Sequence, residues 1–118
     1  MHELSIAENI IDIVRQYVPE TELIQVRGVR LAIGSQSGIS AEALEFGYSA
    51  LVSESALGNS SLNIEIVPYR LRCEECGTEF TSDDGLVACP SCAGVKCMVI
   101  AGTEMRLIDI MLADAEEA

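Results

Sequence analysis

Long hydrophobic runs are absent from this 118-residue sequence. The longest apolar stretches, such as Met98 to Ala101, are far shorter than the roughly 20 residues of a membrane-spanning helix. The first residues also lack the basic and apolar segments of a secretory signal, because Glu3, Glu8 and Asp12 lie where these would be. We therefore expect a cytoplasmic protein in a reducing compartment, with no membrane partner.

Basic residues are also scarce. Seven lysines and arginines stand against nineteen acidic residues, which gives a net charge of −12, and Lys96 is the only lysine. A phosphate backbone is repelled by such a charge, so nucleic acid is excluded as a partner. The acidic residues are dispersed along the chain, as is typical of a solvated surface.

Cysteine is the residue type with a clear pattern. The count of five is odd, which argues against a disulfide scaffold in a chain without an export signal. Four of the five form two C-x-x-C pairs, "CEEC" and "CPSC", separated by twelve residues: Cys73, Cys76, Cys89 and Cys92. Four thiolates at this spacing predict a tetrahedral Zn²⁺ site with no open position, which is structural rather than catalytic. Cys97 is assigned no role.

Two amphipathic helices are predicted from apolar residues at helical spacing. The first covers Leu4 to Val18, with a core stripe that includes Tyr17, and "SIAE" (Ser5–Glu8) matches a capping box at its start. The second starts at Ala41, with Ser40 as its N-cap, continues to about Ser55 and ends near Gly58.

Three strands are predicted between and after these helices. They lie in residues 23–33, with a bend at Gly28, in residues 62–67, and within residues 98–112. The order of elements predicts an α+β fold with two amphipathic helices on a small three-stranded sheet and an inserted, zinc-ribbon-like four-cysteine loop. We expect residues 1–69 and 97–118 to form one domain and residues 70–96 to form the zinc-binding domain.

The single histidine, His2, follows the first methionine directly. An unmodified chain offers the α-amine of Met1 together with the backbone nitrogen and imidazole Nδ1 of His2, which can close two chelate rings in one plane. Planar nitrogen ligation suits Ni²⁺ or Cu²⁺, whereas zinc prefers tetrahedral sites. The alternative is an exposed histidine without a role, since the first residues of a domain are often poorly ordered.

The stretches "MHELSIAENIIDIV", "IGSQSGISAEALEFGY", "CEECGTEF" with "CPSC", and "GTEMRL" together resemble the HypA/HybF family of hydrogenase nickel-insertion accessory proteins. The resemblance extends along essentially the whole chain. It implies a metallochaperone that binds Ni²⁺ at "MHE", with His2 as ligand beside the Met1 amine and Glu3, and that keeps structural Zn²⁺ in the four-cysteine site. The partners implied are a GTPase accessory protein and the hydrogenase large subunit.

One residue departs from that family pattern. Where the family usually has an acidic residue, this chain has Ser40. Either nickel is held more weakly, or Glu42 takes over, or Ser40 is simply a helix cap. The client, a hydrogenase alone or also a urease, is left open.

The sequence also bears on two other classes of function. A zinc-ribbon interaction module without a nickel role would also explain the four cysteines, but such a module would be expected to present a basic face. An enzyme is not expected, because no nucleophile with a base and no phosphate-binding glycine loop are visible.

Overall fold

The computed structural model describes residues 3–113, which divide into two compact units. The first unit takes in the described chain up to Leu31, then Ile39–Glu65 and the chain from Arg106 onward. The second takes in Ala32–Gly38 and Ile66–Met105. Both α-helices therefore belong to the first unit, and all five cysteines belong to the second.

Helix α1 (Glu3–Tyr17) confirms the first predicted helix, and its buried stripe consists of Ile6, Ala7, Ile10 and Val14. Two details of the prediction were wrong. Ser5 lies inside the helix, so the Ser5–Glu8 pair does not cap its start. Tyr17 is 76% exposed, because the helix ends there and the next residue, Val18, turns inward instead.

The strand predicted over residues 23–33 begins later than expected. Residues Glu20–Gln25 form a short 3-10 helix, η1, and strand β1 covers Val26–Gly34. The turn starts after Pro19, whose carbonyl accepts a hydrogen bond from the Glu22 N–H at 2.8 Å. Leu23 is therefore a buried residue of this helical turn and not of the strand. The strand contributes the fully buried residues Val26, Val29, Leu31 and Ile33.

Helix α2 (Ala41–Val52) confirms the second predicted helix, although it ends before the predicted end near Gly58. Ser40 is its N-cap, as predicted: the Ser40 Oγ accepts a hydrogen bond from the Ala43 N–H at 3.2 Å. The segment after α2 consists of turns, with a hydrogen bond from the Ser55 N–H to the Val52 carbonyl.

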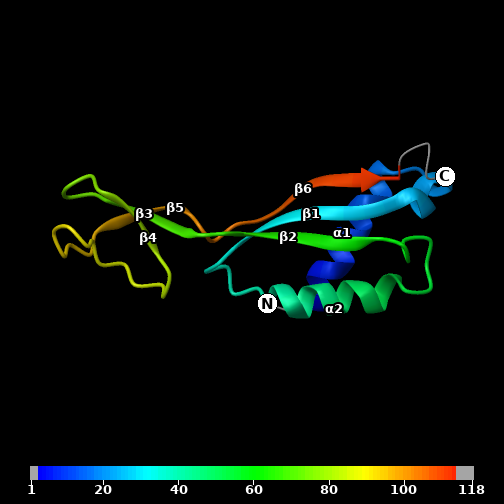
Figure 1. Cartoon of the computed structure of the whole chain (residues 1–118), viewed down its shortest axis with the longest axis horizontal. Helices are drawn as coiled ribbons and strands as arrows, with labels where there is room; N and C mark the ends of the chain where they lie inside the picture. Colours follow the sequence, from blue (N-terminus) through cyan, green and yellow to red (C-terminus); the bar gives the residue numbers. More distant parts are fainter. Residues whose placement is uncertain (1–2, 114–118) are drawn as a thin grey trace. The chain divides into compact units, whose positions relative to one another are not determined.

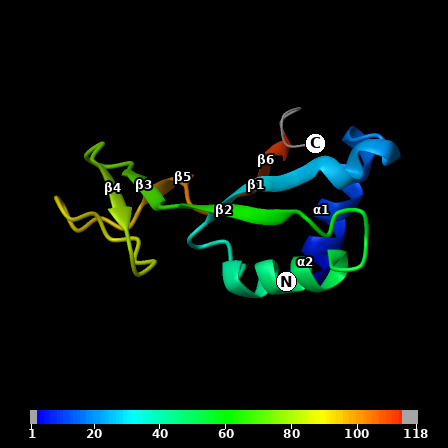
Figure 2. The same cartoon turned by 45° about the vertical axis from the view of Figure 1, so that its right-hand side comes forward.

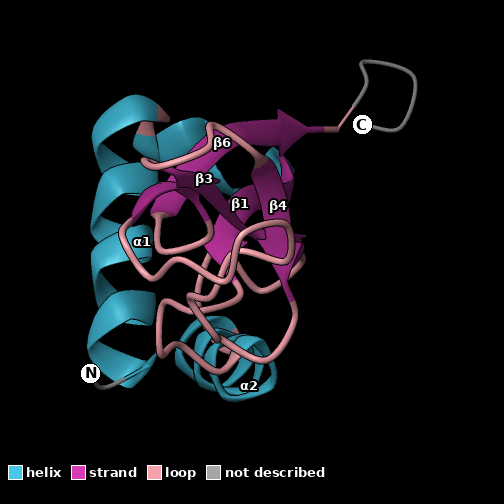
Figure 3. Ribbon diagram, turned by 90° about the vertical axis from the view of Figure 1, so that its left-hand side faces the viewer, coloured by secondary structure: helices cyan, strands magenta, loops and turns pink. Residues whose placement is uncertain are grey.

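The main sheet has the order β2-β1-β6, so β1 lies between β2 (Ser61–Val67) and β6 (Met105–Leu112) (Figure 1). Helices α1 and α2 cross each other on the same side of this sheet (Figure 3). The buried side chains of β1 and of both helices fill the layer between them. The predicted α+β fold, with two helices on a three-stranded sheet, is confirmed.

The four-cysteine segment contains a second sheet, which the sequence analysis treated as a loop. Its antiparallel strands β3 (Tyr69–Cys73), β4 (Glu79–Ser82) and β5 (Cys97–Ala101) have the order β4-β3-β5 (Figure 2). Leu71, in the central strand, is fully buried, but few other apolar side chains of this sheet are buried. So small a core needs a further source of stability.

Candidate metal centres

Four cysteine side chains meet at one end of the second sheet. Cys73 ends β3, Cys76 lies in the turn after it, and Cys89 and Cys92 lie in the loop between β4 and β5. Their four Sγ atoms all lie within 4.8 Å of one another, and the pairs Cys73–Cys92 and Cys76–Cys89 are each 3.6 Å apart. A tetrahedron with metal–sulfur bonds of about 2.3 Å has edges of about 3.8 Å. The structure thus brings together the four predicted residues in a geometry that fits a thiolate-bound ion.

Each cysteine pair lies in a turn that is closed by the same kind of backbone hydrogen bond. In the first turn, the carbonyl of Cys73 accepts from the Gly77 N–H at 2.9 Å, and in the second the carbonyl of Cys89 accepts from the Ala93 N–H at 2.8 Å. Gly77 and Ala93 both have positive φ, 78° and 62°. Ala93 could not be identified from the sequence, because alanine gives no signal for this conformation.

The surroundings of two of the four sulfurs shift their pKa values in opposite directions. Hydrogen bonds with the Thr78 side chain and backbone, followed by one with Cys89, lower the pKa of the Cys76 thiol to about 6. The Gly94 N–H lowers the pKa of Cys92, but hydrogen bonding with Cys73, together with burial, outweighs it and raises this pKa to about 12. A cation among the four sulfurs would favour the thiolate form of all of them.

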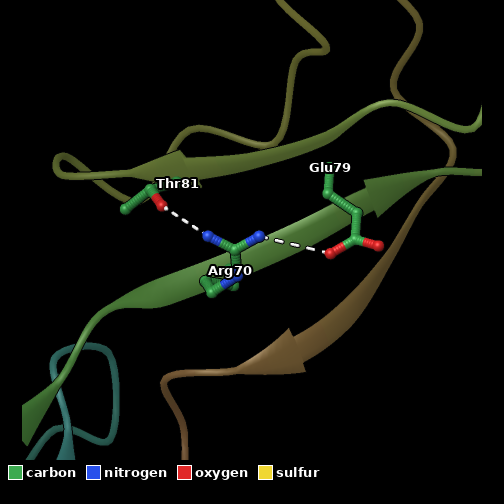
Figure 4. A network of polar contacts seen from close by, with 3 residues as sticks. All are labelled: Arg70, Glu79 and Thr81. Carbon is green, nitrogen blue, oxygen red and sulfur yellow. Dashed lines mark hydrogen bonds and ion pairs between the residues drawn. The ribbon is translucent and has the colours of Figure 1, made fainter.

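A polar network joins the two strands that flank the first cysteine pair (Figure 4). The Arg70 guanidinium on β3 donates to the Glu79 carboxylate at 3.2 Å and to the Thr81 hydroxyl at 3.4 Å on β4. All three side chains are exposed, so the network adds little free energy and chiefly orients one strand against the other.

Cys97 lies beside the cluster without belonging to it. It stands directly opposite Cys73 in the pairing of β3 with β5, and its thiol donates to the Val87 carbonyl at 3.5 Å. The group of four possible ligands does not include it.

The second predicted centre lies at the start of the chain. Met1 and His2 fall outside the described residues. Glu3 is the first described residue of α1, and its carboxylate Oε2 accepts a hydrogen bond from the backbone N–H of Ser40 at 3.0 Å. Ser40 and Glu42 line a shallow hollow at the start of α2, together with Ala43 and Phe46.

The family described as "Hydrogenase/urease nickel incorporation, metallochaperone, hypA" matches residues 1–112. The chain belongs to the HypA family. It is 35% identical to the hydrogenase maturation factor HypA of Chlorobium luteolum over 99% of this chain and 100% of that protein. It is 37% identical to the HypA of Chloroflexus aggregans over 92% of this chain and 96% of that protein.

Solved structures agree on the fold. The solution structure of the Ni metallochaperone HypA from Helicobacter pylori superposes with a TM-score of 0.62 at 23% identity, over 97% of this chain and all of that one. Members of the HypA family are nickel metallochaperones and maturation factors, not enzymes, so this chain has a role in nickel incorporation and works with the hydrogenase maturation machinery. Within residues 3–113, no helix is long and apolar enough to cross a membrane.

Proposed function

We propose that this protein binds Ni²⁺ at its N-terminus and, with a GTPase accessory protein, helps to insert the ion into the large subunit of a [NiFe] hydrogenase. The observation that carries this proposal is the family match over residues 1–112, which includes His2 and all four paired cysteines. The same match disfavours a zinc-ribbon interaction module without a nickel role. The curated relatives are named for hydrogenase maturation, which supports hydrogenase as the client.

The four-cysteine cluster is proposed to hold structural Zn²⁺. Sulfur–sulfur distances of 3.6 Å fit tetrahedral thiolate coordination, and Cys73 and Cys89 are buried while Cys76 and Cys92 are exposed. Zinc bound there would neutralise the thiolates and stabilise a sheet with few buried apolar side chains. Four protein ligands leave no position for substrate, so this ion would stay while nickel is transferred.

The nickel site is proposed to be a chelate of the Met1 amine, the His2 backbone nitrogen and the His2 imidazole. Planar nitrogen donors select Ni²⁺ over ions that prefer tetrahedral or oxygen-rich sites. Ser40 is engaged as a helix cap, as its hydrogen bond with the Ala43 N–H supports. Glu42, the residue that would supply an acidic group in place of position 40, lines the same hollow as Ser40.

A nickel titration of three untagged proteins tests this site: the native chain, His2→Ala, and a chain extended at its N-terminus with His2 in place. The extension converts the Met1 amine into an amide and so removes one corner of the plane. We expect both variants to lose nickel, measured by calorimetry and by the visible band of planar Ni²⁺, and to keep their zinc. Unchanged nickel affinity in the extended protein would rule out the terminal chelate, and unchanged affinity in His2→Ala would rule out a nickel role for "MHE".

A further inference from the structure

The fifth cysteine, Cys97 on β5, lies directly opposite Cys73 on β3. The neighbouring pair of residues exchanges a backbone hydrogen bond, from the Glu74 N–H to the Lys96 carbonyl at 2.9 Å. Because bonded and non-bonded pairs alternate along antiparallel strands, Cys73 and Cys97 form a non-hydrogen-bonded pair. The Cys73 N–H accordingly points away from β5 and donates to the Thr78 carbonyl at 2.9 Å.

A non-hydrogen-bonded pair brings two side chains as close together as a sheet allows. Residues that lie directly opposite each other have their side chains on the same face of the sheet. Their Cα atoms lie about 4.5 Å apart in such a pair, and a disulfide spans Cα distances of about 4.4–6.8 Å. The backbone therefore places Cys73 and Cys97 for a cross-strand disulfide without a rearrangement of the strands.

The two sulfurs of this pair differ in their accessibility and in their role. Cys73 is one of the four proposed zinc ligands and is buried, whereas Cys97 lies outside that group and is partly exposed. The Cys97 thiol donates to the Val87 carbonyl at 3.5 Å and lies 4.0 Å from the Gly94 carbonyl oxygen. In the zinc-bound protein, Cys97 is thus the one cysteine whose sulfur the metal does not use, and solvent can reach it.

We propose that Cys97 is a site of oxidative modification, at which hydrogen peroxide produces a Cys73–Cys97 disulfide that takes one ligand away from the zinc ion. This inference rests on the proposed zinc site. Zinc binds thiolate, and a sulfur in a disulfide is no longer one, so the disulfide and the complete zinc site exclude each other. Because zinc binding contributes to the folding of the second unit, oxidation of this one pair would loosen that unit.

Two steps account for the atoms and electrons of this reaction. The Cys97 thiolate attacks one oxygen of the peroxide, the O–O bond breaks, and a sulfenic acid forms while hydroxide leaves and takes up the thiol proton as water. The Cys73 thiolate then attacks the Cys97 sulfur, the S–S bond forms, the S–O bond breaks, and the second hydroxide takes a proton from solvent. The two sulfurs lose two electrons, which reduce the peroxide to two waters. Burial, followed by the nearby Cys73 and Cys89 sulfurs, raises the pKa of Cys97, so the first step is slow at neutral pH.

Peptide mapping of the zinc-loaded native protein after treatment with hydrogen peroxide tests the pairing. Trypsin cuts after Arg72 and Lys96, so the four proposed ligands lie on the peptide 73–96 and Cys97 lies on the peptide 97–106. With the remaining thiols alkylated, we expect these two peptides to be linked, with a mass about 2 Da below their sum. A zinc-sensitive dye should report the release of zinc in step with the linked product.

A second digestion identifies which of the four ligands is linked. A glutamate-specific protease cuts after Glu74 and so separates Cys73 from Cys76 and the later cysteines. We expect the peptide that carries Cys97 to be linked to Cys73–Glu74. Treatment with a dithiol and added zinc should remove the link and restore the zinc content.

Two variants show whether the release of zinc depends on Cys97. Cys97→Ser removes the proposed partner of Cys73 and keeps all four ligands. Met98→Leu is the matched control, because it removes the next sulfur along β5, whose side chain points to the opposite face of the strand. At one peroxide concentration, we expect Cys97→Ser to release zinc about tenfold more slowly than the native protein, since its free thiol is gone. Met98→Leu should release zinc at the native rate.

The outcomes distinguish this proposal from the one on which it rests. If the purified native protein holds no zinc, the proposed zinc site itself is wrong. If zinc is present but Cys97 is linked to another cysteine, or stays unlinked while the exposed Met98 is oxidised, only the disulfide is wrong. Equal rates of zinc release in the native protein and Cys97→Ser would show that oxidation begins at the ligands and would overturn the proposal.

Discussion

The phenol of Tyr48 is a buried polar group in the core beneath the main sheet. Its hydroxyl lies 2.6 Å from the Ser60 Oγ, and the Ser60 hydroxyl donates to the Leu57 carbonyl at 2.6 Å. Because the Ser60 proton is used on Leu57, Tyr48 donates to Ser60. Burial raises the pKa of Tyr48 above its ordinary value of about 10, and the hydrogen bond with Ser60 lowers it only in part.

Replacing Tyr48 with Phe should lower the free energy of unfolding at neutral pH by about 0.5–1.5 kcal/mol, the net value of a hydrogen bond. The raised pKa means that the folded protein holds the phenol proton more tightly than the unfolded chain does. Its stabilising effect is complete below pH of about 10 and is lost as the pH rises through the folded-state pKa. Urea unfolding across this alkaline range should therefore show a steeper loss for the native protein than for Tyr48→Phe.

Ser60→Ala is the comparison for this prediction. It leaves the buried Tyr48 hydroxyl without its acceptor, while the Leu57 carbonyl keeps the hydrogen bond from the Ser60 backbone N–H at 3.0 Å. Its cost at neutral pH should therefore be larger than that of Tyr48→Phe, about 1–3 kcal/mol. An alkaline loss of equal steepness in Tyr48→Phe and the native protein would contradict the assignment to Tyr48.

Single residues could be predicted from the sequence where their chemistry is tied to spacing. The four cysteines and the Ser40 cap are of this kind, because a metal or a helix end demands a particular side chain at a particular position. Ala93 could not be predicted. Its positive φ goes with the backbone hydrogen bond from its N–H to the Cys89 carbonyl, a property of the turn that the alanine side chain does not indicate.

At the scale of elements, the backbone between β5 and β6 approaches two other segments of the second unit closely. The Gln36 N–H donates to the Gly102 carbonyl at 2.8 Å, and Gly102 has a φ of 111°. A Cβ at Gly102 would clash with the Tyr69 Cα and lie 2.8 Å from the Pro68 carbonyl oxygen. Only glycine fits both the conformation and the space.

Gly102→Ala is expected to destabilise the second unit by about 2–5 kcal/mol, the sum of backbone strain and overpacking. Gly38→Ala is the matched control, since Gly38 also has positive φ, 80°, but nothing lies within 4 Å of a Cβ there. Its cost should be only the strain, about 1–2 kcal/mol. Thermal unfolding with zinc content measured in parallel checks both, and equal costs in the two variants would contradict the steric argument.

Elements with a long regular pattern could be predicted, and those set by tertiary contacts could not. Both helices follow from apolar residues at helical spacing, which is a local property. The 3-10 turn η1 was read as strand because Leu23 and Ile24 continue the apolar run into Val26. The sheet of β3, β4 and β5 was missed because its central strand alternates Leu71 with two arginines and its core is small.

For the whole molecule, the sequence determined the architecture better than it could determine the nickel site. Two helices have one sheet to cover, and four cysteines at fixed spacing have one way to surround an ion. The contact of Glu3 with Ser40 joins residues far apart in sequence, and neither residue alone indicates the other. The family resemblance named both positions, but only the fold shows that a backbone N–H and a carboxylate connect them.

Zinc removal should divide the molecule along its two units. All four proposed ligands lie in the second unit, while both α-helices lie in the first. The free energy of metal binding therefore contributes to the folding of the second unit only. We expect about one zinc per chain in the purified protein. A chelator should abolish the chemical-shift dispersion of the amide resonances of the second unit. It should leave most of the helical circular dichroism signal unchanged.

Cysteine variants sharpen this prediction. Cys89→Ser should reproduce the effect of the chelator, whereas Cys97→Ser should keep its zinc, because Cys97 lies outside the four-sulfur group. Both substitutions change one sulfur to oxygen, and only the Cys89 sulfur belongs to that group. Loss of zinc in Cys97→Ser would show that the ligand set is wrong. Loss of nearly all helical signal on chelation would show that the first unit, despite its own buried core, depends on the metal for its fold.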